Sequence, residues 1–168
     1  MRRFPRPSSK NWTTWLVQPD AAPAPRGPVL FEKTLPSTPK AIAGCLDLLL
    51  AQLAAEALID AGPEIAVQTR LVLDEALVNC VKHGNRGDRK KKVFVTLYRL
   101  PERRKRTGWG LIVRDQGRGF SVAEVPDVEQ ESSLFLEHGR GVLLMRQFLN
   151  AVQYFEGGRV LLMEKYRA

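Results

Sequence analysis

The stretch Arg70 to His83 carries polar side chains at a spacing that could do chemistry. Its apolar residues cover most of the circumference of a helix, so we expect this helix to be buried nearly all round. Glu75, Asn79 and His83 nevertheless follow one another at intervals of four residues, which places them in one stripe along the helix. Polar groups on a buried helix must be hydrogen-bonded or used.

The stripe has two interpretations. In the first, it is only the exposed edge of a capped helix end, and the isolated E-x-x-x-N pattern favours this one. In the second, the side-chain carbonyl of Asn79 supplies one ligand of a Mg²⁺ ion, which keeps most of its waters and takes its other ligands from phosphates. Glu75, one turn earlier, would then accept a proton from water or a substrate hydroxyl as a general base.

The segment Asp115-Gln116-Gly117-Arg118-Gly119 follows an expected strand and forms a glycine-rich turn. A carboxylate at Asp115 can accept a hydrogen bond from an exocyclic amine such as that of adenine. Gly117 and Gly119 would let the backbone approach a flat ring closely. The alternative is a turn that only closes a strand.

A second glycine turn, Gly139-Arg140-Gly141, directly precedes an expected helix. The unpaired N–H groups of a helix N-terminus form a phosphate site, and Arg140 could add charge-assisted hydrogen bonds. A lone G-x-G motif is weak evidence for a phosphate site. The dinucleotide fingerprint is excluded because Leu144 stands where its third glycine belongs, and the chain has no G-x-x-x-x-G-K-[ST] phosphate loop.

The elements that must position these motifs predict an α+β fold. Ser37 or Thr38, followed by Pro39, is typical of a helix N-cap. The order of elements indicates a two-layer sandwich, with helices on one face of a mixed, mostly antiparallel sheet. We expect strands at 29–31, 92–98, 109–114, 151–155 and 160–166, helices at about 38–60, 63–82 and 138–149, and a long polar loop at 121–137.

The composition fits one globular domain, because 44% of the 168 residues are hydrophobic and 26% are charged. Residues 1–28 hold 6 of the 11 prolines and predict an extended N-terminal arm before a domain at 29–168. We expect Trp12 and Trp15 to dock on the domain or on a partner, the alternative being an ordered strap with no further function.

Several classes of protein are excluded. Two cysteines are too few for a disulfide scaffold or a multi-cysteine zinc site. No membrane span is expected, because the longest apolar region, 41–59, is interrupted by Asp47, Gln52 and Glu56. The basic start leads into no hydrophobic core and is therefore not a signal peptide. We expect a cytoplasmic protein with no membrane partner.

The net charge of +8 comes largely from two basic clusters around one expected hairpin, whose turn is 101–107. The first follows the polar helix and could contribute to phosphate binding. A solvated face is the favoured interpretation for both, an acidic protein partner comes next, and nucleic acid comes last because no recognition helix or stacking platform is evident. The first cluster is Arg86, Arg89, Lys90, Lys91 and Lys92, and the second is Arg99, Arg103, Arg104, Lys105 and Arg106.

Taken together and in this order, the motifs resemble the histidine-kinase-like ATP-binding fold, called GHKL or Bergerat, over roughly residues 29–168. The chain looks most like the small anti-sigma-factor serine kinases of that superfamily. The resemblance implies that Glu75 is the catalytic base, Asn79 the Mg²⁺ ligand, and His83 part of the helix end beside the nucleotide. It also implies that 121–138 is the ATP lid. The remaining implied ATP contacts are Asp115 at the adenine, Gly117 and Gly119 beside it, and Gly139, Arg140 and Gly141 at the phosphates.

The resemblance implies an ATP- and Mg²⁺-dependent serine/threonine kinase that phosphorylates an antagonist protein of the anti-anti-sigma type and sequesters a sigma factor. It leaves a homodimer open. One departure is that the family often has a Thr near the adenine in a late strand, whereas residues 158–161 read Gly-Arg-Val-Leu. The missing Thr favours an alternative, a nucleotide-binding partner-switching regulator without useful phosphoryl transfer, while the intact Glu75 favours the kinase. A basic nucleic-acid-binding domain is the third hypothesis.

Overall fold

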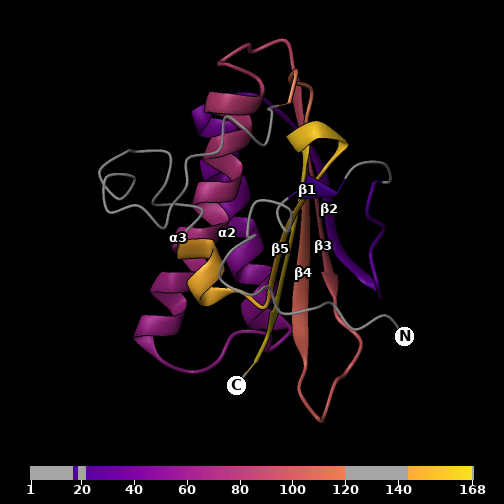
Figure 1. The fold of residues 1–168 in the computed structure, drawn as a ribbon. Coiled ribbons are helices and arrows are strands. Elements are labelled where there is room, and N and C mark those ends of the chain that lie inside the picture. The colour runs from indigo at the N-terminus through magenta and orange to yellow at the C-terminus, as the bar shows by residue number, and fades with distance from the viewer. Residues whose placement is uncertain (1–16, 19–21, 120–143, 168) are drawn as a thin grey trace, which may run out of the picture.

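The computed structural model describes residues 17–18, 22–119 and 144–167 of the chain. Its helices form one layer against one face of a six-stranded sheet (Figure 1). The strand order is β1-β5-β6-β4-β3-β2, in which β1 and β5 are parallel and every other neighbouring pair is antiparallel. The expected α+β sandwich, with helices on one face of a mixed, mostly antiparallel sheet, is confirmed.

A short strand at Val17–Gln18, within the predicted arm, was not expected. The five expected strands fall close to their expected positions, except that the first of them continues to Pro36 instead of ending at Phe31. It pairs with the next strand along almost its whole length, from Val29 opposite Tyr98 to Pro36 opposite Lys92. The strands are β1 (Val17–Gln18), β2 (Val29–Pro36), β3 (Lys92–Arg99), β4 (Gly108–Asp115), β5 (Ala151–Phe155) and β6 (Val160–Tyr166). A short 3₁₀ turn, η4 (Glu156–Gly158), joins the last two strands.

Helix α2 (Pro39–Ala55) begins as the sequence predicts and ends earlier. Thr38 is the N-cap, and its hydroxyl oxygen accepts a hydrogen bond from the amide of Ala41 at 3.3 Å. The expected end near residue 60 is wrong, because Ala57 adopts a left-handed conformation with φ of 50°. The reversal returns Leu58 to the core, where its amide donates to the carbonyl of Leu53.

Helix α3 (Pro63–Asn79) was expected to continue to residue 82 as a regular helix. It changes instead into a π-helical turn, η1 (Cys80–Gly84), closed by a 2.7 Å hydrogen bond from the amide of Asn85 to the carbonyl of Cys80. Single π-turns inside helices often occur at functional sites. A helical segment at 144–148 agrees with the third expected helix.

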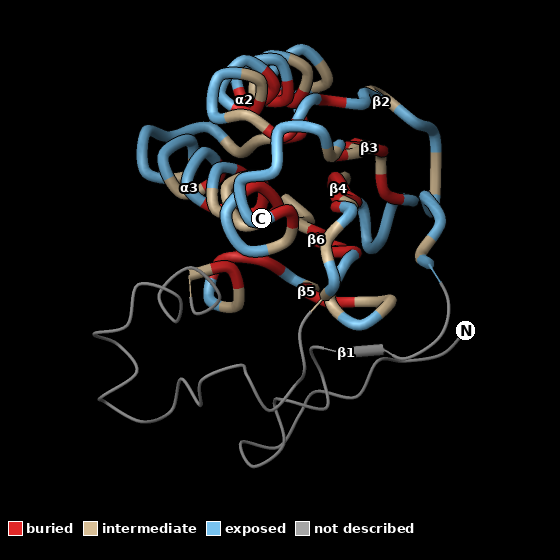
Figure 2. The backbone as a smooth tube through the Cα atoms, turned by 90° about the horizontal axis from the view of Figure 1, so that it is seen from above, coloured by how far each residue is buried: buried red, intermediate tan, exposed pale blue. Residues whose placement is uncertain are grey.

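The main core lies between the helices and the sheet, and a smaller apolar cluster covers the other face (Figure 2). Alternation along the strands divides the two sets, so that Val95 and Val113 face the helices while Tyr98 and Ile112 face away. Both faces of the central strands are therefore buried. Within the described ranges, no helix has the length and hydropathy to cross a lipid bilayer.

The last part of the N-terminal arm crosses the outer face of the sheet. β1 pairs with β5 at one edge and β2 forms the opposite edge, so residues 22–28 pass along the side away from the helices (Figure 2). Arg26 forms an ion pair there with the buried Glu164, which also accepts a 2.9 Å hydrogen bond from the hydroxyl of Tyr98. Trp12 and Trp15 lie outside the described residues, and the domain boundary at residue 29 stays a prediction.

Candidate functional site

Glu75 and Asn79 lie one turn apart on α3, both half-buried. The side-chain amide of Asn79 donates a hydrogen bond to Oε1 of Glu75 at 2.9 Å. This bond orients the Asn79 amide, because its NH₂ group faces Glu75 and its Oδ1 oxygen is left for another partner. The carboxylate and amide that the sequence placed in one stripe therefore form a direct pair.

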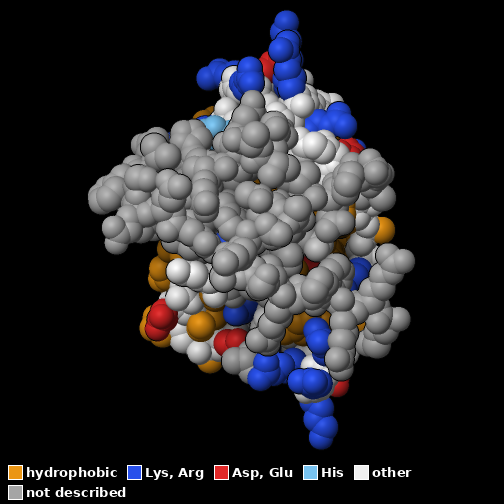
Figure 3. Space-filling view, in the orientation of Figure 1, with side chains coloured by type: hydrophobic (Ala, Val, Ile, Leu, Met, Phe, Trp, Pro, Cys, Tyr) orange, Lys and Arg blue, Asp and Glu red, His pale blue; other side chains and the backbone are white. Residues whose placement is uncertain are grey.

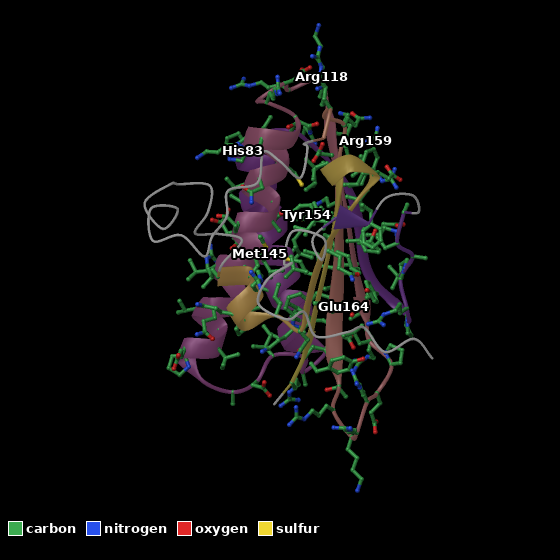
Figure 4. All side chains as sticks on the ribbon, in the orientation of Figure 1. His83, Arg118, Met145, Tyr154, Arg159 and Glu164 are labelled. Carbon is green, nitrogen blue, oxygen red and sulfur yellow. The ribbon has the colours of Figure 1, made fainter. Side chains whose placement is uncertain are left out.

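His83 does not continue the stripe in a regular way. It lies within η1, where the wider turn changes the angular step per residue, so a spacing of four residues no longer keeps one line. The imidazole is exposed at the C-terminal end of the helix (Figure 4). The residue that follows it, Gly84, is the point at which the helix meets the turn after β4.

Asp115 ends β4, and its side chain is only 7% exposed. The amide of Gly117 donates to Oδ1 of this carboxylate at 2.7 Å. Burial raises the pKa of the Asp115 carboxyl, while the Gly117 hydrogen bond and the charges of Lys91 and Arg159 act in the lowering direction. An acceptor held at the end of a central strand is the arrangement that the adenine prediction requires.

The glycines around Asp115 are required by close packing. A Cβ on Gly84 would overlap the Asp115 carboxylate, and one on Gly117 would overlap the carbonyl of Gly84. Gly119 has φ of 75° and lies against the carbonyl of Gly157. The sequence interpretation assigned Gly117 and Gly119 to a flat ligand, and the structure shows that they also let the turn fit between the helix end and η4.

Asn85 is a positioning residue that the sequence interpretation did not single out. Its fully buried side chain joins separate elements. The amide nitrogen donates to Oγ of Ser37 at 3.1 Å and to the carbonyl of Lys92 at 3.0 Å, and the side-chain oxygen accepts from the amide of Gln116 at 2.9 Å. Asn85 therefore fixes the residue next to Asp115 relative to η1. No local signal could have found this role, because two of these partners are 48 and 31 residues away.

Tyr154 on β5 is a second residue that the sequence did not single out. It lies between α3 and the sheet (Figure 4) and is 9% exposed. Burial raises the pKa of its hydroxyl, and the nearby Cys80, Glu75 and Asp115 act in the same direction. Tyr154 is thus close to both the Glu75–Asn79 pair and Asp115. Strand alternation alone could only class it as core.

The predicted phosphate-binding residues Gly139, Arg140 and Gly141 lie outside the described residues, and so does the predicted lid at 121–138. The helical segment that follows them is anchored by Met145 and Phe148, which are both buried.

The two basic clusters lie at opposite ends of β3. The register pairs Val93 with Asp115 and Arg99 with Trp109, so the first cluster is beside Asp115 and the second is at the far hairpin (Figure 3). The seven steps from Lys92 to Arg99, at about 3.3 Å each, separate them by roughly 23 Å. The second cluster therefore lies away from the predicted nucleotide site at the Asp115 end.

A Mg²⁺ site of the expected kind fits the residues present. No group of three or more His, Cys, Asp or Glu side chains in the described ranges is placed to hold a metal ion. Mg²⁺ bound with a nucleotide does not need such a group, since waters and phosphates supply most of its ligands. The Oδ1 oxygen of Asn79, oriented by the bond to Glu75, is a suitable single protein ligand.

The sequence model of the histidine kinase-like ATPase domain family matches residues 35–165. This range contains α2, α3, strands β3 to β5 and all of β6 except its last residue, together with the Glu75–Asn79 pair and Asp115. The chain therefore belongs to the histidine kinase-like ATPase domain family, a class of ATP-binding domains. No curated protein matches the chain at the significance threshold.

Proposed function

We propose that this domain binds ATP with Mg²⁺ between α3 and the Asp115 turn and transfers the γ-phosphoryl group to a serine or threonine hydroxyl of a partner protein. The observation that carries the proposal is the hydrogen-bonded pair of Glu75 and Asn79 on the helix whose end packs against Asp115. Tyr154 lies near both parts. The residues proposed as general base, metal ligand and base-reading carboxylate would thus be held on elements that pack directly against one another.

Asp115 would bind the adenine. Its carboxylate accepts from the amide of Gly117 through Oδ1, and its remaining acceptor capacity suits the exocyclic amine of adenine. Guanine carries a carbonyl at that position, which a carboxylate repels. The site would therefore favour ATP over GTP.

Asn79 and Glu75 would act at the phosphates. Mg²⁺ held by Oδ1 of Asn79 would neutralise phosphate charge, which is a large part of phosphoryl-transfer catalysis. Glu75 would take the proton of the incoming hydroxyl, whose oxygen forms the new bond to the γ-phosphorus while the bond to ADP breaks. Gly139, Arg140 and Gly141 would hold the terminal phosphates, and 121–138 would close over them as a lid.

The partners proposed are an antagonist protein of the anti-anti-sigma type, which receives the phosphoryl group, and a sigma factor, which the domain sequesters in the cytoplasm. This step is supported by the resemblance of the motif set and by the presence of Glu75, which phosphoryl transfer to a hydroxyl requires. A homodimer is compatible with this scheme.

A nucleotide-binding regulator without useful transfer is the second candidate. The observation that favours it is the sequence at 158–161, where Arg159 precedes β6, Val160 begins it and no Thr is present. Arg159 has no hydroxyl, and its guanidinium contacts Glu156.

The test is calorimetric titration with ATP, with and without Mg²⁺, beside measurement of ADP formation in the presence of a serine-bearing candidate partner. Asn79→Ala should lose Mg²⁺-dependent binding. Glu75→Gln should bind ATP and form no ADP, whereas Glu64→Gln, an exposed carboxylate on the same helix, should behave as wild type. Binding by wild type without any transfer would select the regulator, and absence of ATP binding would overturn both candidates.

A further inference from the structure

The hairpin between β3 and β4 ends in four consecutive exposed cations, Arg103, Arg104, Lys105 and Arg106. The chain reverses there in a tight turn, in which the amides of Arg103 and Arg106 each donate to the other residue's carbonyl, at 3.0 Å and 2.9 Å. In Figure 3 basic side chains project from this end of the molecule. The tip is far from the ATP site, so the proposed function does not use it.

The backbone of this turn does not suit its residues. Arg104 and Lys105 have φ of 51° and 62°, in the left-handed region. A two-residue hairpin turn with positive φ at both central positions is of type I′, which strongly prefers Asn-Gly. Side chains with a Cβ adopt this conformation at a cost in free energy. The chain thus holds Arg-Lys at positions where Asn and Gly would fit the backbone better.

The turn is nevertheless held firmly at its base. The amide of Leu100 donates to the carbonyl of Gly108 at 2.9 Å, and that of Arg167 donates to the carbonyl of Thr107 at 2.9 Å. The hydroxyl of Tyr166 donates to the carbonyl of Pro101 at 3.3 Å. The tip is therefore presented in a fixed position instead of on a loose loop.

The cations below the tip are neutralised by ion pairs. Arg26 pairs with Glu164, Arg99 with Glu56, and Arg167 with Asp60. Among the residues that the structure describes, no ion pair includes any of the four tip cations. The tip thus carries four cations without an ion-pair partner among the described residues, above a collar of three ion-paired carboxylates, Glu56, Asp60 and Glu164.

We propose that the hairpin tip is the docking point for an acidic segment of a partner protein. A compact acidic segment can contact the four cations alone, whereas a nucleic acid follows an extended basic surface and would here meet side chains that are already neutralised in ion pairs. The tip also lacks an aromatic side chain for stacking on bases. The left-handed Arg104 and Lys105 are kept for their charge, at a cost in turn stability.

The decisive variant is the double change Arg104→Asn/Lys105→Gly, which creates the favoured I′ turn and removes two charges. The probe is a short fluorescein-labelled poly-glutamate peptide, titrated by anisotropy at low salt. We expect about tenfold weaker binding by this variant, with a melting temperature equal to or above that of wild type. The matched control, Arg89→Gln/Lys90→Gln, removes the same charge from exposed residues at the opposite end and should retain peptide binding.

Three results would overturn the proposal. One is failure of the wild type to bind the peptide at low salt, and another is equal loss of affinity in both double variants, which would indicate only net charge. The third is tighter binding of a DNA duplex than of the peptide, lost in the tip variant, which would assign the tip to nucleic acid. None of these results bears on ATP binding, so the two proposals fail independently.

Discussion

Gly84 lies directly against the carboxylate of Asp115, close enough that no side-chain carbon could stand between them. The contact joins the end of the polar helix to the end of a central strand, which are 31 residues apart in the sequence. Gly117 packs on the carbonyl of Gly84 in turn. The two halves of the proposed ATP site, one on the helix and one on the sheet, therefore meet through glycine backbone.

Gly84→Ala should weaken ATP binding strongly, by about tenfold or more, because the added methyl group must displace the Asp115 carboxylate or separate η1 from β4. Calorimetry with ATP and Mg²⁺ measures the effect. Gly44→Ala is the control, since that glycine lies in α2 with open space around its Cα and should gain up to about 1 kcal/mol of stability. Unchanged ATP affinity in Gly84→Ala would disprove the assignment of Asp115 to the nucleotide.

Asn85→Ala tests whether this residue positions the Asp115 turn. Removing it leaves Ser37, Lys92 and the amide of Gln116 without their buried partner, so unfolding should become easier by about 2 kcal/mol or more, and ATP affinity should fall. Ser37→Ala removes only one of these hydrogen bonds and leaves the one to Gln116, so it should cost about 1 kcal/mol and retain ATP affinity. If both variants bound ATP with equal affinity, Asn85 would contribute to stability alone and would not position the Asp115 turn for nucleotide binding.

The sequence predicted those features that rest on local patterns. Hydrophobic alternation placed β3 to β6 nearly to the residue, and the Ser37-Thr38-Pro39 signal located the start of α2. The separation of four residues between Glu75 and Asn79 predicted that they share one face of a helix, and in the structure a hydrogen bond joins them. These successes share one cause, since each depends on neighbours along the chain.

The missed features depend on contacts that are distant in sequence. The end of α2 follows from the return of Leu58 to the core, which the mainly apolar sequence at 57–61 does not reveal. The π-helical turn η1, at 80–84, packs against the Asp115 turn, which is distant in the sequence. The role of Asn85 likewise depends on hydrogen-bond partners in other elements. The separation of the two basic clusters likewise required the register of β3 with β4.

Arg26→Ala tests the attachment of the arm to the outer face of the sheet. The Glu164 side chain is buried, so removing its cationic partner leaves a carboxylate supported only by Tyr98, and stability should fall by about 2 kcal/mol. Arg70→Ala breaks an exposed ion pair with Asp47 and should change stability by less than about 0.5 kcal/mol. Urea denaturation of both variants provides the comparison, and equal effects would contradict a specific role for Arg26.

Asp115→Asn separates stability from nucleotide recognition. Burial raises the pKa of the Asp115 carboxyl, which means that the folded state binds this proton more tightly than the unfolded state does. The ionised carboxylate therefore lowers the free energy of unfolding at neutral pH. Asn keeps the oxygen that accepts from Gly117 and removes the buried charge. The variant should therefore be more stable than wild type at pH 7, and this advantage should vanish as the pH falls below the ordinary value of 3.8.

The same variant should lose the preference for ATP over GTP, because a neutral amide no longer distinguishes an exocyclic amine from a carbonyl by charge. Urea midpoints at pH 7 and near pH 4, measured beside ATP and GTP titrations, give both readouts. A variant that is less stable than wild type at pH 7 would contradict the burial argument. A variant with unchanged selectivity would show that another group reads the base, and Tyr154, which lies close to Asp115, would be the next residue to change.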